Sequence, residues 1–166
     1  MRHLPESACA RSNHSRMETI MVTEPQLFRM DTDIPDDLPK KVRILCRTDR
    51  MIGAIQVIRK GGENNLHSHS HLDGMWTVLS GHARFYGEDP ERHIAELGPF
   101  EGILIPRGFK YWFESTGDDL LVLHQVEASD IPMPTMEDLV KDRTDHKPRP
   151  GWMDPALKNL DGPKGG

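Results

Sequence analysis

Residues 61–71 read GGENNLHSHSH, a run in which three histidines alternate with serines after a pair of glycines. Alternate residues of an extended chain point to the same face, so His67 and His69 would project together from a strand. Two imidazoles at that spacing suit a single metal ion or a single bound molecule. The other interpretation is a solvated polar loop in which the histidines have no role. Apolar runs on both sides, at 51–58 and 76–79, favour the site.

The composition limits the class of protein. The chain has 166 residues, enough for one domain with a hydrophobic core. Its formal net charge of −5 and its pI near 6.0 exclude the basic surface that nucleic-acid binding requires. No apolar run reaches the length of a membrane span, and two cysteines make no disulfide framework. We therefore expect a cytoplasmic protein that binds neither nucleic acid nor a membrane.

The central part of the chain consists of short apolar runs separated by turn residues. The runs have the length and the β-branched and aromatic content of strands, and no helical stripe lies among them. Such a series is typical of an all-β sandwich or barrel. The predicted strands are 42–47, 51–58, 75–79, 82–86, 93–97, 102–105, 110–114 and 120–126.

The two ends of the chain differ from this pattern. Residues 1–20 lack periodicity and are predicted to be a disordered leader, and residues 21–41, rich in proline and aspartate, an irregular arm. Residues 42–127 would form the barrel. Residues 128–166 are polar and proline-rich, so we predict an irregular tail with one or two helical turns at 135–140.

Two parts of the sequence resemble the two motifs of the cupin superfamily. Gly61, followed after five residues by the His-Ser-His at 67–69 and later by Gly81, resembles the first motif. The Pro-Arg-Gly turn at 106–108 resembles the second. The resemblance covers residues 42–126 and implies an all-β fold, a single double-stranded β-helix barrel. It implies less about function, because one fold hosts many chemistries.

The resemblance also implies a metal site with four ligands, of which this sequence keeps two. His67 and His69 occupy the histidine positions of the first motif, but its glutamate position holds Gly74. The histidine position of the second motif holds Tyr111. Because a firmly held catalytic ion needs at least three protein ligands, a third must be found elsewhere. The ion would be a divalent metal such as iron, zinc, manganese or nickel.

His124 is the preferred third ligand, because it is the polar residue on a face of 120–126 that is otherwise apolar. The alternative is a core histidine satisfied by one hydrogen bond. Tyr111 is a weaker ligand, since its phenol must lose a proton with a pKa of about 10, and it serves more easily in proton transfer. His71 is expected at the rim. The assigned metal ligands are His67, His69 and His124, and the assigned catalytic residues are Tyr111 and His124.

Aromatic residues surround these positions. Trp76, Phe85 and Phe113 form either ordinary core or the substrate-binding wall of a cavity. We predict a metal-dependent enzyme acting on a small organic molecule, which the resemblance implies to be an oxygenase, isomerase, cyclase or lyase. The alternatives are a metal-free isomerase or epimerase that uses a histidine with Tyr111, and a non-catalytic protein that binds a small ligand. We also expect a homodimer, in which the arm covers exposed strand edges of the partner.

Overall fold

The structure is a computed structural model, and it describes residues 22–147. The predicted leader and the end of the predicted tail lie outside the described residues. Across residues 22–147, no helix has the length and apolar character needed to cross a bilayer. The elements are β1 (Lys40–Arg47), β2 (Met51–Ile58), β3 (Leu66–His69), β4 (Leu72–Ser80), β5 (Ala83–Tyr86), β6 (His93–Leu97), β7 (Gly102–Ile105), β8 (Trp112–Ser115), β9 (Leu121–Ser129), α1 (Met136–Asp142) and β10 (Arg143–Lys147).

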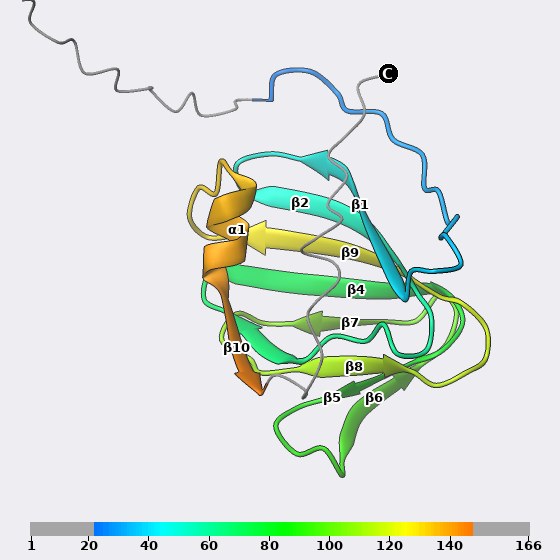
Figure 1. The fold of residues 1–166 in the computed structure, drawn as a ribbon. Coiled ribbons are helices and arrows are strands. Elements are labelled where there is room, and N and C mark those ends of the chain that lie inside the picture. Colours follow the sequence, from blue (N-terminus) through cyan, green and yellow to red (C-terminus); the bar gives the residue numbers. More distant parts are fainter. Residues whose placement is uncertain (1–21, 148–166) are drawn as a thin grey trace, which may run out of the picture.

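The strands form three antiparallel sheets (Figure 1). The largest has the order β1-β2-β9-β4-β7, a second has the order β6-β5-β8, and β10 pairs with β3. The eight strands predicted from the sequence are all present to within a few residues. The all-β barrel expected from the sequence is therefore confirmed, and β3 and β10 are added to the expected strands.

One hydrophobic core lies between the five-stranded sheet and the β6-β5-β8 sheet. Ile58, Val78 and Leu123 enter it from the first sheet, and Phe85 and Phe113 enter it from the second. None of these five side chains has exposed surface. Burying a side chain of this size stabilises the fold by about 1.5–3 kcal/mol, so this core holds the two sheets together.

The outer face of the five-stranded sheet is also covered over part of its area. Ile55, Val57 and Val122 are buried there, and Ile34 of the N-terminal arm packs against them. Residues 22–39 carry no helix or strand. Strand β2 and the first part of β9 are consequently buried on both faces. Both faces therefore carry apolar residues, and the sequences of these strands show no alternation of apolar and polar residues.

Gly81 closes the first sequence motif for a steric reason. Its φ of 75° lies in the left-handed region, which favours glycine. A β-carbon at this position would lie 2.7 Å from the Leu120 carbonyl oxygen. The turn from β4 to β5 therefore needs a glycine both for its backbone angle and for its contact with the chain before β9.

The segment after β9 forms one wall of the site. Thr135 caps α1, accepting a hydrogen bond from the Asp138 backbone N–H, while the Asp138 carboxylate accepts one from the Thr135 backbone N–H. This capping box satisfies two backbone donors at the start of the helix. The one or two helical turns predicted here are confirmed. Strand β10, which was not predicted, follows directly and pairs Arg143 with His69.

We expect Thr135→Ala to lower the free energy of unfolding by about 0.5–2 kcal/mol, because the start of α1 loses its side-chain acceptor. Urea unfolding of the variant and of wild type measures the difference. Thr32→Ala, at an exposed position of the arm, is the matched control and should change little. Equal stability of Thr135→Ala and wild type would show that the cap does not stabilise α1.

Candidate functional site

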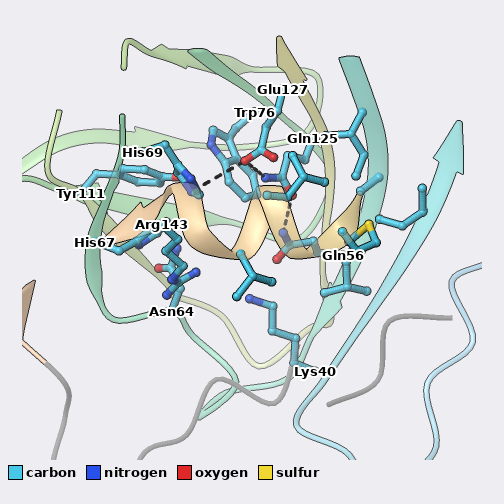
Figure 2. Close-up of a pocket in the computed structure, with 17 residues that line it drawn as sticks. Lys40, Gln56, Asn64, His67, His69, Trp76, Tyr111, Gln125, Glu127 and Arg143 are labelled. Carbon is cyan, nitrogen blue, oxygen red and sulfur yellow. Dashed lines mark hydrogen bonds and ion pairs between the residues drawn. The ribbon is translucent and has the colours of Figure 1, made fainter. Parts of the chain in front are cut away.

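A cavity of about 110 Å³ lies between α1 and the inner face of the five-stranded sheet, beside β3 (Figure 2). This volume has room for several water molecules or for a small organic molecule. One side of the cavity is apolar and is formed by β1, β2 and α1, with Val42, Ile44, Ile52, Ala54, Met136 and Leu139. The other side is polar and is formed by Lys40, Asn64, His67, His69, Tyr111, Gln125, Glu127 and Arg143.

The histidine pair of β3 faces this cavity. The ring centroids of His67 and His69 lie 5.2 Å apart, at right angles to each other. His67 is only 2% exposed, and its Nδ1 lies 2.8 Å from the Asn65 carbonyl oxygen. Because a carbonyl can only accept, Nδ1 carries the proton and Nε2 carries the lone pair. The alternation of β3 therefore brings both imidazoles to one cavity, as the spacing indicated.

Tyr111 joins the histidines through the second motif. Its backbone exchanges two hydrogen bonds with His67, at 3.0 and 2.9 Å, and the two rings lie 4.4 Å apart. The turn that precedes it is anchored nearby, because the Gly108 N–H donates to the His69 carbonyl at 2.7 Å. Tyr111 is 2% exposed and lines the cavity. The two motifs, distant in sequence, thus form one wall.

Glu127 is a site residue that sequence reasoning missed. It lies on β9 directly opposite Gly74 of β4, and it is 8% exposed. Among the described residues, a β-carbon at residue 74 would meet only the Trp76 ring nitrogen within 4 Å, at 3.4 Å. Gly74 and Glu127 also border the same small recess, together with His69 and Tyr111. The carboxyl group of Glu127 therefore lies next to residue 74, on the neighbouring strand.

A chain of polar contacts holds Glu127 in place (Figure 2). Gln56 Nε2 donates to Gln125 Oε1 at 2.5 Å, and Gln125 Nε2 donates to Glu127 Oε1 at 2.6 Å. Burial raises the pKa of Glu127, while the nearby His69 opposes this shift. A carboxyl group in this environment holds its proton to a higher pH than an exposed one and is suited to act as an acid.

His69 lies between two carboxylates. Its Nε2 is 3.9 Å from Glu127 Oε1, and its Nδ1 is 3.5 Å from Asp142 Oδ2. Asp142, at the end of α1, is 6% exposed and accepts a hydrogen bond from the His71 backbone N–H. The helix end therefore fixes the histidine strand and presents a carboxylate to the far side of the imidazole. The Nε2 of His69 is the ring nitrogen that lies near Glu127, while its Nδ1 has no hydrogen-bond partner among the described residues.

The prediction that His124 belongs to the site was wrong, because its side chain does not point to the inside of the barrel. His124 pairs with Thr77 of β4 and Ile55 of β2, whereas its neighbours Leu123 and Gln125 point to the inside of the barrel. The sequence assignment put Leu120, Val122 and Val126 on the inner face with it. Because the start of β9 is buried on both faces, its apolar residues do not reveal which face is inner. His71, expected at the rim, lies there with its Nδ1 3.0 Å from Asp130 Oδ1.

The three aromatic residues assigned to substrate binding divide into two groups. Trp76 lines the cavity, is 2% exposed, and has a ring nitrogen with no hydrogen-bond partner among the described residues. Phe85 and Phe113 do not line the cavity. They pack on each other with centroids 5.2 Å apart inside the core. Phe85 and Phe113 are therefore core residues, which was the alternative to a role in substrate binding.

The predicted metal site can be tested against the donors in the cavity. Its polar wall supplies two imidazoles and the Glu127 carboxyl group, and such donors suit several divalent metals. Within residues 22–147, however, no three His, Cys, Asp or Glu side chains are gathered closely enough to hold a metal ion. The donors as arranged therefore do not fit a firmly bound ion, and ligation by His67 and His69 stays a prediction.

The buried His67 predicts a pH effect on stability. Burial, followed by the charge of Arg143 and by His69, lowers the pKa of His67 well below its usual value of 6.5. Below pH 6.5 the unfolded chain therefore binds a proton that the folded protein does not, and the free energy of unfolding falls as the pH falls. The contribution of this residue approaches about 1.4 kcal/mol per pH unit.

We expect His67→Asn to lose less stability than wild type between pH 6.5 and pH 5. Denaturant unfolding in the presence of a chelator measures the difference without a contribution from bound ions. The comparison with wild type cancels the opposite effect of Glu127, whose raised pKa favours the folded state at lower pH. Parallel stability curves for the two proteins would contradict the buried neutral state of His67.

Comparisons with known proteins support the fold. No protein-family model and no curated protein matches the sequence significantly. Among solved structures, a protein with a double-stranded β-helix domain from Klebsiella pneumoniae matches with a TM-score of 0.55 and 20% identity, covering 64% of this chain and 91% of that one. KdgF from Halomonas sp. matches with a TM-score of 0.54 and 16% identity over 70% and 99% of the two chains. The cupin domain of Schizosaccharomyces pombe Cnp3 matches with a TM-score of 0.50 and 16% identity over 55% and 61%. The chain therefore has the double-stranded β-helix fold of the cupin superfamily.

Proposed function

We propose that the chain is an enzyme of the isomerase or epimerase type, which moves a proton on a small organic molecule bound in the cavity. The observation that carries this proposal is the position of His69 between Asp142 and Glu127 on the wall of a partly apolar cavity. Pairs of titratable groups in unlike environments are typical of acid–base sites. The proposal takes up the metal-free alternative that the sequence left open.

His69 would act as the base and Glu127 as the acid. A proton on Nδ1, which lies 3.5 Å from the Asp142 carboxylate and has no hydrogen-bond partner among the described residues, would leave the lone pair on Nε2 for the substrate. Nε2 takes a proton from a carbon next to a carbonyl group, and the carboxyl group of Glu127 returns a proton to the substrate at its new position. Because His69 Nε2 and Glu127 Oε1 are 3.9 Å apart, the extra proton on His69 would then pass to the Glu127 carboxylate through one water molecule, which restores both groups.

Tyr111, His67 and Trp76 would bind and orient the substrate. The lone pair on His67 Nε2 is available as an acceptor, since Nδ1 donates to Asn65. The Trp76 ring N–H, which has no partner among the described residues, is a donor for a substrate oxygen. Tyr111 lies against His67 and adds a phenol that both donates and accepts. These groups give a small substrate one orientation in the cavity.

Hydrogen exchange with solvent tests the proposal. Small ketones, aldehydes and oxo and hydroxy acids are incubated with the protein in D₂O, and NMR follows deuterium entering carbon positions. We expect wild type to label at least one compound and His69→Gln to do so about 10²–10⁴-fold more slowly. His82→Gln, at an exposed histidine of the β4–β5 turn, should match wild type. Binding of a compound without exchange would instead support the non-catalytic ligand-binding alternative.

Metal binding by His67 and His69 is a second candidate property. It is favoured by the Nδ1 hydrogen bond of His67 to a backbone carbonyl, because metal-bound histidines are commonly oriented in this way. This candidate predicts that elemental analysis finds a divalent ion in wild type and little in His67→Ala or His69→Ala, with the fold retained; an ion-free wild type would remove it. The same metal content in all three proteins would remove both histidines as ligands.

The homodimer also stays a prediction, as does the cytoplasmic location. Residues 22–39 cross the outside of the barrel without forming a helix or strand, and Leu27 and Phe28 are 97% and 50% exposed. Apolar side chains on an irregular arm suit a contact with a second subunit. Light scattering at micromolar concentration should give twice the mass of the chain. A monomer mass would contradict the dimer.

A further inference from the structure

A buried glutamine lies in the wall of the cavity. Gln56 of β2 is 6% exposed and lines the cavity from the same strand face as Ile52 and Ala54. The other side chains of β2 are apolar, and the strand lies in the middle of the barrel wall. A buried carboxamide is costly unless its oxygen and its nitrogen both find partners. The partners of Gln56 therefore show what this residue contributes to the cavity.

The nitrogen of the Gln56 carboxamide has a partner, and its oxygen has none. Glu127 Oε1 accepts from Gln125 Nε2, so the oxygen of Gln125 faces Gln56. Gln56 Nε2 donates to that oxygen. Figure 2 shows the three side chains in a row, with Gln56 at the end away from Glu127. Within residues 22–147 the buried Gln56 Oε1 has no hydrogen-bond partner, so this row ends in an acceptor.

Trp76 of β4 adds an unpartnered donor to the same cavity. Its ring N–H is buried and finds no acceptor in the part of the chain that the structure describes. This nitrogen would lie 3.4 Å from a β-carbon at residue 74, so it sits beside Gly74. Gly74 borders one recess with His69 and Glu127. The cavity therefore presents a donor close to the proposed acid and base, and an acceptor farther along the sheet.

A ligand that meets both groups must accept one hydrogen bond and donate another. A carbonyl oxygen accepts from the Trp76 N–H, and a hydroxyl group donates to the Gln56 oxygen. The volume of about 110 Å³ limits the rest of the ligand to a few carbon atoms or one ring, which the apolar wall of β1, β2 and α1 would contact. Water would also satisfy both atoms, but water would give the protein no preference for a ligand with a hydroxyl group.

We infer that the substrate carries a hydroxyl group on the carbon next to its carbonyl group, and that Gln56 selects it by accepting a hydrogen bond from that hydroxyl. The carbonyl oxygen would lie on the Trp76 N–H, with the neighbouring carbon beside His69 and Glu127. Small hydroxy ketones and hydroxy aldehydes have this pattern. A site that hydrogen-bonds a substrate hydroxyl rejects analogues without one, because a buried polar atom is then left unpaired. The inference rests on the proposed function and names its substrate class.

Matched pairs of ketones test the inference. Hydroxyacetone is compared with butanone, and acetoin with methyl isopropyl ketone, so that a methyl group replaces the hydroxyl in each pair. Calorimetry gives the dissociation constants, and thermal unfolding gives the shift in Tm. We expect wild type to bind at least one hydroxy ketone at least about tenfold more tightly than its methyl counterpart. Because burial of apolar surface alone favours the methyl compound, such a preference reports a hydrogen bond to the hydroxyl.

Two substitutions separate the hydroxyl contact from the carbonyl contact. Gln56→Met should weaken the hydroxy ketone about tenfold and leave the methyl ketone unchanged. Trp76→Phe should weaken both members of a pair by the same factor, because both carry the carbonyl. The matched controls are Gln26→Met, in the arm, and Trp112→Phe, whose ring stacks on Tyr86 outside the cavity, and both should bind as wild type does. If Gln56→Met does not fold, Gln56→Asn withdraws the oxygen while keeping an amide, and it should also lose the preference.

Equal binding of both members of each pair by wild type would overturn the inference, and so would binding of none of the four ketones. A structural role of Gln56 would weaken both members equally in Gln56→Met, and that result would overturn it as well. Failure of the proposed function is distinguishable. A preferred hydroxy ketone that takes up no deuterium on carbon would leave the ligand class standing and remove the enzyme. Deuterium entering only ketones without a hydroxyl would keep the enzyme and remove the inference.

Discussion

Glu127→Gln should slow hydrogen exchange on the substrate about 10²–10⁴-fold while the protein stays folded. The amide keeps the shape of the side chain, and its oxygen still accepts the Gln125 hydrogen bond, so the cavity retains its form. What is lost is the proton that the carboxyl group returns to the substrate. Deuterium incorporation measured by NMR gives the rate, and circular dichroism with thermal unfolding shows that the fold is retained.

The matched control for this variant is Glu114→Gln. Glu114 is also partly buried, and it accepts a 2.6 Å hydrogen bond from the Tyr86 hydroxyl, but it does not line the cavity. Its substitution should leave the exchange rate unchanged. Equal rates for Glu127→Gln and wild type would remove Glu127 as the acid and return that role to Tyr111.

Phe113→Ala should lower the free energy of unfolding by about 3–5 kcal/mol. The side chain has no exposed surface and contacts the rings of Trp76 and Phe85, so its removal leaves a hole between the two sheets. Urea unfolding measures the loss. Phe113→Leu, which fills part of the hole, should lose less.

Phe100→Ala is the comparison for this core position, because Phe100 is 85% exposed and its loss should change stability little. The prediction also separates the two roles considered for Phe113. A variant that unfolds like wild type but binds the substrate much more weakly would restore the substrate-binding role. Loss of stability with binding retained at low temperature would support the core role.

The strands of the barrel were predictable because most of them carry a local signal. Strand β4 alternates buried and exposed residues, and glycines mark the turns on either side of β5. The histidine pair and Tyr111 were predictable for a related reason. Each sits at a fixed distance from a turn that the sequence displays, and the turns pack on each other through Gly108 and His69. Local patterns were enough to place these residues together.

The residues of β9 alone did not allow a prediction of which of its side chains point to the inside of the barrel. Leu121, Val122 and Leu123 are all buried, since one face meets the main core and the other meets the cluster that includes Ile55. Alternation identifies an inner face only where the other face is in water. The choice of His124 over its neighbours was therefore made without a usable signal.

Glu127, Asp142 and Arg143 were missed because contacts distant in sequence bring them to the site. Glu127 enters through the pairing of β9 with β4, and Arg143 enters through the pairing of β10 with β3. The sequence did contain one indication of Glu127. It is a carboxylate near the end of an apolar strand, and the glutamate position of the first motif is occupied by Gly74. No local pattern indicated that residues 143–147 return to the histidine strand.

The central claim is that His69 and Glu127 transfer protons on a substrate in the cavity without help from a bound ion. The most direct test follows deuterium entering the substrate with wild-type protein before and after treatment with a chelator. The account predicts carbon-bound deuterium at the same rate in both samples. Exchange that stops after chelation and returns when a divalent metal is added would contradict it, and so would the absence of exchange in every compound tested.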